Sequence, residues 1–260
     1  MFKIIAARRQ QGHRTMRFPD APPPPMPDRF RGRPTMDAKA CAEECRACAD
    51  ACPTGAVMVS GKMRVDLGKC LFCSDCLEAC PAQAITYSSD YRLATSCRDD
   101  LIVEQGTDQL RLAEAMKAEL MRVLGRSLKL RQVSAGGCNG CEADTNVLGT
   151  VGWDLGRFGI QFVASPRHAD GLLITGAVTR NMELALKKTY DAVPSPKIVI
   201  AVGACAISGG PYAGHAEVCN GAESVVPVDL YVPGCPPHPL TILDGLLRFM
   251  GRIREPASAS

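Results

Sequence analysis

The second half of the chain alternates short apolar runs with longer segments of helical periodicity. The runs are rich in β-branched residues and short enough for single strands, whereas the segments between them repeat apolar residues every three or four positions. The expected strands are Leu128–Val133, Ile160–Ala164, Gly171–Thr175, Lys197–Val202 and Val228–Val232, and the expected helices cover about 142–150, 179–192 and 239–252. Strands that alternate with helices predict an α/β domain with a mainly parallel sheet covered on both faces.

The first half of the chain is organised differently. Residues 1–36 form a basic, Pro-rich arm, residues 37–90 hold most of the cysteines, and residues 91–126 connect these parts to the α/β domain at 127–254. Apolar residues at helical spacing predict an amphipathic helix over 108–124, so we expect a helical connector.

The arm carries most of the positive charge. Residues 1–35 hold eight Lys and Arg against two Asp, and the rest of the chain is mildly acidic. Its prolines favour extended, polyproline-like backbone. Two interpretations stay open, a disordered tail and a strap that becomes ordered only on a neighbouring subunit. The charge favours docking to an acidic partner or anionic headgroups, and no recognition motif supports nucleic acid.

Cysteine usage indicates the class of protein. Ten of the fourteen cysteines stand in closely spaced groups, which in a cytosolic protein indicates metal or redox chemistry rather than disulfides. No apolar run approaches the roughly 20 residues that cross a bilayer. The N-terminus is basic but lacks the apolar core and cleavage site of a secretory signal. We therefore expect a cytosolic chain, or one peripheral to a membrane.

An internal repeat organises the cysteine-rich part. The segment CRACADACPTGA at 45–56 recurs as CSDCLEACPAQA at 73–84, an offset of 28 residues. Such self-similarity predicts a duplicated unit with pseudo-two-fold symmetry.

The repeat resembles the bacterial pattern C-x2-C-x2-C-x3-C-P, whose last cysteine binds the other cluster. This predicts two [4Fe–4S] clusters, one on Cys41, Cys45, Cys48 and Cys80, and one on Cys70, Cys73, Cys76 and Cys52. The first repeat departs from the pattern because three residues separate Cys41 from Cys45; the extra residue forms a bulge or leaves Cys41 a poor ligand. Zinc sites also use closely spaced cysteines, but the duplicated spacing and the Cys-Pro endings favour iron–sulfur clusters.

Four further cysteines follow expected strands of the α/β domain. Cys138 and Cys141 lie between the first strand and a helix, and Cys205 and Cys235 lie in two later loops. Loops beyond the carboxyl ends of parallel strands are where this architecture places ligands. The neighbouring glycines allow tight turns, and a helix start favours negative charge. The two cysteines of the first loop and the single cysteines of the two later loops together make a third set of four thiolates.

Several motifs occur together and in order. They are GCNGCE at 137–142, PRHAD at 166–170, TGAVTR at 175–180, GACA at 203–206 and YVPGCPP at 231–237. Over about residues 127–253 the chain resembles the small subunit of membrane-associated, energy-converting [NiFe] hydrogenases, which is related to the cluster-bearing B subunit of complex I. Residues 37–90 are similar to the two-cluster ferredoxin subunits of the same complexes, so the chain resembles a fusion of two subunits.

The resemblance implies an α+β ferredoxin-like domain followed by a flavodoxin-like α/β domain. It implies three [4Fe–4S] clusters, with Cys138, Cys141, Cys205 and Cys235 holding the proximal one. The expected partners are a [NiFe] hydrogenase-type large subunit and membrane-arm subunits, which would place the chain in the cytoplasm at the inner face of the membrane. The chain would transfer electrons for an oxidoreductase without a catalytic residue of its own.

Two rival functions differ in their chemistry. The complex I branch usually has adjacent cysteines where this chain has Cys138-x2-Cys141, which favours the hydrogenase branch. The first rival is the equivalent subunit of a nickel-free, hydrogenase-related or quinone-reducing complex. The second is a zinc-bound scaffold without redox function.

The other polar and sulfur-containing residues receive weaker expectations. Glu142 relays protons to the large subunit or balances the start of a helix. Arg167 and His168 are expected at an interface, and Cys97 and Cys219 have no spaced partner and no assigned role.

Overall fold

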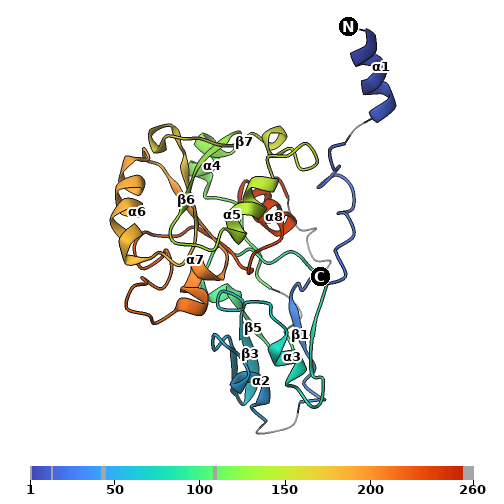
Figure 1. Ribbon diagram of the computed structural model, residues 1–260, viewed down its shortest axis with the longest axis vertical. Helices are drawn as coiled ribbons and strands as arrows, with labels where there is room; N and C mark the ends of the chain where they lie inside the picture. Colours follow the sequence, from blue (N-terminus) through green and yellow to red (C-terminus); the bar gives the residue numbers. More distant parts are fainter. Residues whose placement is uncertain (1, 13, 42–44, 108–109, 254–260) are drawn as a thin grey trace.

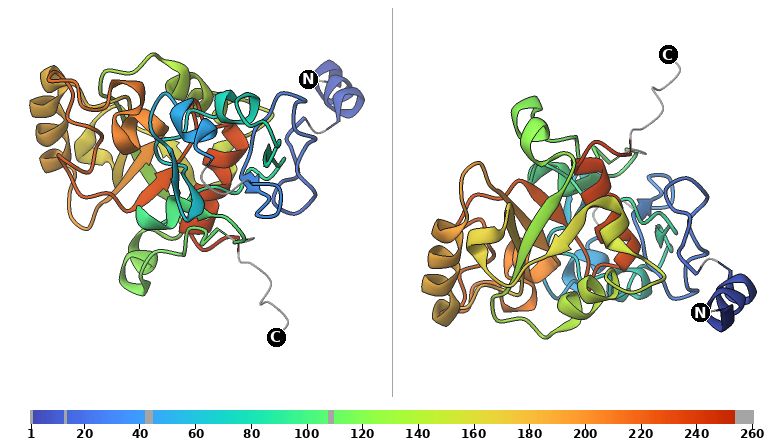
Figure 2. Two further views of the ribbon diagram at one scale, coloured as in Figure 1. Left: turned by 90° about the horizontal axis from the view of Figure 1, so that it is seen from below. Right: turned by 90° about the horizontal axis from the view of Figure 1, so that it is seen from above.

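The computed structural model describes residues 2–12, 14–41, 45–107 and 110–253, and it shows two domains and an N-terminal arm (Figure 1). The larger domain holds the parallel sheet and its helices. Helix α1 (Phe2–Gln11) projects away from the body, at the end opposite α6 (Arg180–Ala192) in both views of Figure 2. In these ranges no helix is both long enough and apolar enough to cross a bilayer.

Within the described residues, the larger domain has five parallel strands in the order β10-β9-β8-β6-β7. The strands are β6 (Leu128–Ser134), β7 (Ile160–Phe162), β8 (Gly171–Thr175), β9 (Ile198–Val202) and β10 (Leu230–Val232). Numbered within the domain, this order is 2-1-3-4-5, the order of flavodoxin-like sheets. The expected parallel sheet is confirmed, although β7 and β10 are shorter than their apolar runs suggest.

Alternate residues of the central strands face two different cores. Leu172 and Ile174 lie in the core that includes residues of α6 and α7 (Ala204–Ser208). Leu173 lies in the other core, which α4, α8 and the end of α5 complete. The bounds of these helices are α4 (Ala118–Leu124), α5 (Gly140–Val147) and α8 (Pro239–Phe249). Because side chains alternate along a strand, helices cover both faces of the sheet.

The smaller domain repeats its elements at the offset of the sequence repeat. Its elements are β1 (Pro34–Met36), α2 (Ala47–Asp50), β2 (Val57–Ser60), β3 (Lys62–Asp66), α3 (Asp75–Glu78), β4 (Ile85–Tyr87) and β5 (Ile102–Glu104). Helix α3 begins and ends 28 residues after α2, and β4 begins 28 residues after β2. Antiparallel pairs β1–β4 and β2–β3 complete two related halves. The expected duplication is therefore present in the backbone.

Four short 3-10 helices connect the described elements. They are η1 (Asp99–Leu101), η2 (Leu155–Phe158), η3 (Pro166–His168) and η4 (Gly210–Tyr212).

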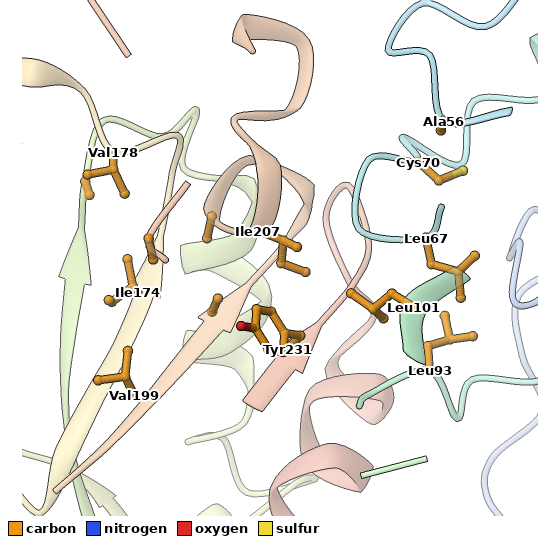
Figure 3. Close-up of a cluster of buried hydrophobic side chains, with 14 of the residues drawn as sticks. Ala56, Leu67, Cys70, Leu93, Leu101, Ile174, Val178, Val199, Ile207 and Tyr231 are labelled. Atoms are coloured by element: carbon orange, nitrogen blue, oxygen red, sulfur yellow. The ribbon is translucent and has the colours of Figure 1, made fainter. Parts of the chain in front are cut away.

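The two domains share one hydrophobic core. Leu67 and Leu101 of the smaller domain lie in the same buried cluster as Ile207 and Tyr231 of the larger one (Figure 3). Thr95 pairs with Tyr231 through two backbone hydrogen bonds of 3.0 and 2.9 Å. This packing fixes one domain against the other.

Residues 15–36 of the arm pack along both domains instead of forming a free tail. Phe18 is only 5% exposed, and Arg157 of the larger domain donates a 2.6 Å hydrogen bond to its carbonyl. Met16 donates to the Gly152 carbonyl at 2.9 Å. At its end, β1 pairs with β4, so the sheet of the smaller domain includes residues that composition assigns to the arm.

The helix expected over 108–124 is wrong for most of its length. Residues 108–109 lie outside the described ranges, residues 110–117 are not helical, and only α4 remains. The backbone N–H of Ala113 bonds to the Ala94 carbonyl at 2.7 Å, and that of Met116 to the Phe249 carbonyl at 2.9 Å. The apolar residues are buried, as the pattern indicates, but tertiary hydrogen bonds replace those of a helix.

Candidate iron–sulfur sites

The four cysteines of the α/β domain meet at the carboxyl edge of its sheet. Cys138 follows β6, Cys141 and Cys205 lie in the first turns of α5 and α7, and Cys235 follows β10. Burial, together with the other three thiols and Glu142, raises the pKa of Cys141 to about 12. Burial also raises the pKa of Cys205 to about 11, with contributions from Cys235 and Cys138. The structure therefore brings all four predicted residues together.

Glycine backbone lies directly against these sulfurs. A Cβ on Gly203 would lie 2.5 Å from Sγ of Cys141, and one on Gly210 would lie 2.8 Å from Sγ of Cys205. Both glycines have positive φ, of +91° and +56°. The loops thus leave the space beside the sulfurs free of side chains, as a bulky inorganic group requires.

Glu142 joins α5 to the ends of two strands. Its Oε1 accepts hydrogen bonds of 2.6 Å from Ser134 Oγ, at the end of β6, and 2.7 Å from Thr175 Oγ1, at the end of β8. Burial alone would raise the pKa of Glu142, but these hydrogen bonds hold it below its usual range. The geometry supports a charge held at the helix start, and the proton relay stays a prediction.

The cysteines of the smaller domain form the two groups expected from the repeat. Burial raises the pKa of Cys41, and so do the nearby thiols of Cys45 and Cys80. Burial also raises the pKa of Cys48, although backbone hydrogen bonds oppose the shift. The nearby thiols of Cys80 and Cys41 raise it as well. Cys41 thus lies with its predicted partners despite its shifted spacing.

The second group draws one thiol from the first repeat. Burial, with contributions from Cys76 and Cys52, raises the pKa of Cys70 to about 12. Burial raises the pKa of Cys76 too, and Cys73 and Cys52 add to that effect. Cys52 of the first repeat thus lies near thiols of the second, and its exchange between clusters stays a prediction.

Hydrogen-bond donors point at these sulfurs. Backbone N–H groups of Ala56 and Ala84 donate to Sγ of Cys52 and of Cys80, at 3.2 and 3.3 Å. The two bonds occupy the same position in the two repeats. Burial opposes ionisation of Cys52, but such hydrogen bonds hold its pKa below the usual range and so favour the thiolate.

Tyr87 is a candidate residue that the cysteine pattern misses. Its hydroxyl lies 3.5 Å from Sγ of Cys76 and 4.0 Å from Sγ of Cys70. Burial, together with these thiols, raises its pKa, so the hydroxyl keeps its proton and can donate it to sulfur. Comparison of the two repeats could have found it, because Tyr87 replaces Val59, which stands 28 residues earlier and has no hydroxyl.

Two cysteine groups from different domains lie next to each other. Cys235 keeps exposed surface but is partly buried, and this partial burial raises its pKa. Cys138 from its own group and Cys73 from the smaller domain raise it too. The loop of Cys73 also lies beside that of Cys235, because Leu71 and Phe72 line one cavity with Cys235.

The thiol sets match what a four-iron group requires of its ligands. In the described ranges, no three His, Cys, Asp or Glu side chains converge closely enough to hold a single metal ion. Each set nevertheless offers four thiols, as a [4Fe–4S] cluster requires. Backbone N–H donors on sulfur and glycine backbone beside the thiols complete the fit.

The remaining predicted residues lie elsewhere. Arg167 and His168 lie in η3, where an interface role stays a prediction. Cys97 is exposed, and the buried Cys219 lies 3.6 Å from Glu183 Oε2. Neither cysteine joins one of the three groups.

Comparison with known proteins agrees with this division. Residues 138–249 match the family described as NADH ubiquinone oxidoreductase, 20 Kd subunit. Residues 63–86, which span β3, α3 and β4, match a 4Fe-4S binding domain. The chain therefore belongs to the 20 Kd subunit family of oxidoreductase subunits and carries a [4Fe–4S]-binding segment.

Three relatives each resemble about half of the chain. Formate hydrogenlyase subunit 7 of Escherichia coli is 44% identical over 54% of this chain and 55% of its own length. A probable membrane-bound hydrogenase subunit, mbhJ, of Pyrococcus furiosus is 42% identical over 53% of this chain and 83% of its own. The B subunit of NADH-quinone oxidoreductase of Heliobacterium modesticaldum is 43% identical over 45% and 67%. The chain thus spans about half the length of the first of these relatives.

One solved structure is also similar in sequence. It is a chain of the membrane-bound sulfane sulfur reductase, an archaeal respiratory membrane complex, which is 34% identical over 52% of this chain and 75% of that one. The TM-score of 0.45 is too low to support an argument about the fold.

Proposed function

We propose that this chain is the electron-transfer subunit of a membrane-associated [NiFe] hydrogenase complex, with three [4Fe–4S] clusters and no active site of its own. Bound in the three thiol sets, the clusters would supply one-electron transfer. The proposal assigns one cluster to Cys41, Cys45, Cys48 and Cys80, one to Cys52, Cys70, Cys73 and Cys76, and one to Cys138, Cys141, Cys205 and Cys235.

The proximity of Cys73 and Cys235 carries this proposal. The two thiols belong to different domains, yet Phe72, the neighbour of Cys73, lines one cavity together with Cys235. Cys73 also contributes to the raised pKa of Cys235. The shared core of Leu101 and Tyr231 holds the domains in that relationship. We infer a continuous route from the cysteine groups of residues 37–90 to that of the α/β domain (127–254), while the connector (91–126) adds Leu101 and β5 to the smaller domain.

Exposed thiols support a partner subunit at the sheet edge. Cys138 and Cys235 are both exposed in the isolated chain. An iron–sulfur cluster at this edge needs cover from solvent, and we assign that cover to a large subunit of the [NiFe] type. The names of two relatives, formate hydrogenlyase and membrane-bound hydrogenase, agree with this assignment, as does the Cys138-x2-Cys141 spacing. Further partners would hold the complex at the inner face of the membrane.

A second candidate is the equivalent subunit of a nickel-free, complex I-like assembly that reduces quinone. The similarity to the B subunit of NADH-quinone oxidoreductase favours it. The two candidates assign the same thiols to clusters and differ in the large subunit.

The deciding experiment is anaerobic purification of the intact complex through a tag on this chain. Stoichiometric nickel with hydrogen evolution from a reduced donor supports the hydrogenase. Cys235→Ser should then abolish hydrogen evolution and leave nickel in place, whereas Cys97→Ser should change neither. An intact iron-containing complex without nickel or hydrogen evolution would replace the hydrogenase by the second candidate.

A further inference from the structure

The loop that carries Cys73 has an unusual backbone. Phe72 and Ser74, on either side of Cys73, have φ angles of +53° and +90°. Residues other than glycine seldom adopt positive φ, and surrounding structure must hold them there. Such backbone at a ligand loop indicates a conformation that function requires.

The internal repeat provides a control for this observation. Arg46 precedes α2 at the position that Ser74 occupies before α3, and its φ is an ordinary −121°. The positive φ at this position is therefore confined to the second repeat. That repeat contributes Cys73, whose neighbour Phe72 lines one cavity with Arg31 and Cys235.

A residue of the arm contacts both strained positions. Nη1 of Arg31 donates a 3.1 Å hydrogen bond to the carbonyl of Phe72, and Nη2 donates a 3.4 Å hydrogen bond to Oγ of Ser74. The planar guanidinium suits two simultaneous acceptors. Ser74 in turn donates to Glu78 of α3 at 2.8 Å.

The arm holds Arg31 from both sides. Gly32 donates a 2.9 Å hydrogen bond to the Ser88 carbonyl, after which β1 pairs with β4. Before Arg31, the ring of Phe30 packs edge-on against His238, at a centroid distance of 5.5 Å. His238 lies three residues beyond Cys235, so the Phe30–Arg31 pair touches the loops of both cysteine groups.

We propose that Arg31 is a positioning residue that holds the Cys70–Ser74 loop so that Cys73 faces Cys235. The arm would thereby set the electronic coupling between the two domains. The consequence for electron transfer rests on the proposed function, because it assumes clusters on both groups.

The test compares Arg31→Gln with Arg29→Gln in the intact complex. Arg29 is exposed on the same arm and, like Arg31, lines the cavity beside Phe72. Each variant therefore removes one positive charge from the same surroundings. Hydrogen exchange of the loop is measured at the Phe72 amide, which bonds to Sγ of Cys70 at 3.3 Å. We expect exchange to rise about tenfold in Arg31→Gln only, since a hydrogen bond from a charged donor is lost. We also expect a weaker magnetic interaction between the two reduced clusters in this variant.

Unchanged exchange and unchanged magnetic interaction in Arg31→Gln would overturn the proposal, as would equal changes in Arg29→Gln. Loss of only the cluster assigned to Cys52, Cys70, Cys73 and Cys76 in Arg31→Gln would support the proposal. If Arg31→Gln fails to assemble, Arg31→Lys replaces it, because lysine keeps the charge but can reach only one of the two acceptors at a time. Exchange of the Phe72 amide should then rise by less than about tenfold over the wild type, and an unchanged rate would overturn the proposal. An absence of cluster signals in the wild type would defeat the proposed function, while the exchange experiment would still decide the role of Arg31.

Discussion

The carboxylate of Glu142 accepts a 2.7 Å hydrogen bond from the hydroxyl of Thr175. Thr175 ends β8, and Ser134, the other donor to Glu142, ends the neighbouring β6. The chain crosses to opposite sides of the sheet at these two strands, which is where doubly wound folds place their ligands. Glu142 thus fixes the first turn of α5, with Cys141, to this point.

Glu142→Gln should raise the reduction potential of the proximal cluster. The variant keeps the size of the side chain and removes a negative charge beside Cys141, which makes an added electron less unfavourable. Redox titration followed by electron paramagnetic resonance measures the change. Glu183→Gln, on the surface of α6, is the matched control and should leave the potential unchanged. A potential that stays the same or falls in Glu142→Gln contradicts this role.

Tyr87→Phe should lower the potential of the cluster on Cys52, Cys70, Cys73 and Cys76. The variant removes a hydroxyl within reach of two sulfurs, and hydrogen bonds to sulfur stabilise the reduced cluster. One such bond is worth roughly 1 kcal/mol, or about 40 mV for one electron. Tyr212→Phe, at an exposed tyrosine, serves as control. An equal shift at all three clusters would argue against a local effect.

Gly203→Ala should prevent assembly of the proximal cluster. The new Cβ would lie 2.5 Å from Sγ of Cys141, which no rotation of the methyl group can relieve. Gly214→Ala is the control, because Gly214 has a similar φ of +83° but open space around its Cα. Iron analysis should show a loss of about four iron atoms per chain in the first variant only. Full iron content in Gly203→Ala would refute the assignment of this loop.

The stability of the chain should fall when the pH drops below about 6.5, the usual pKa of histidine. Burial lowers the pKa of His238, whose Nδ1 accepts a 3.1 Å hydrogen bond from the N–H of Leu240 at the start of α8. Just below pH 6.5 the histidine is protonated in the unfolded chain but still neutral in the folded chain. His238 therefore contributes its full stability above pH 6.5 and progressively less below it. The slope is at most about 1.4 kcal/mol per pH unit.

His238→Asn isolates this effect. Asparagine also caps helices but does not titrate. Anaerobic urea unfolding measures the stability of both proteins at several pH values. As the pH falls from 6.5 toward the lower pKa of His238 in the folded chain, the variant should lose less stability than the wild type. Identical pH profiles for the variant and the wild type would exclude His238 as the cause.

The sequence predicts the parallel sheet and the grouping of the cysteines because both depend on local spacing. The apolar run at Gly171–Thr175 coincides with β8, since a strand buried on both faces has a nearly continuous apolar sequence. Likewise, the bacterial C-x2-C-x2-C-x3-C-P pattern, whose last three cysteines recur here at an offset of 28 residues, assigns Cys52 to the group of Cys70.

Features that depend on distant contacts escape the sequence. Met116 fits a helical pattern, yet its N–H bonds to Phe249 at the far end of the chain. Phe18 sits in a Pro-rich arm and is buried only because the larger domain offers a site for it. The roles of Tyr87 and Arg31 depend in the same way on which loops the fold brings beside them.

The central claim is that this chain holds three [4Fe–4S] clusters. Iron, acid-labile sulfide and zinc analysis of the anaerobically purified complex, with Mössbauer spectroscopy of this chain, tests it most directly. We predict about twelve iron and twelve sulfide per chain, a brown colour that dithionite bleaches, and no stoichiometric zinc. About eight iron atoms would remove one of the three sites, and zinc without iron would replace the electron-transfer role by that of a structural scaffold.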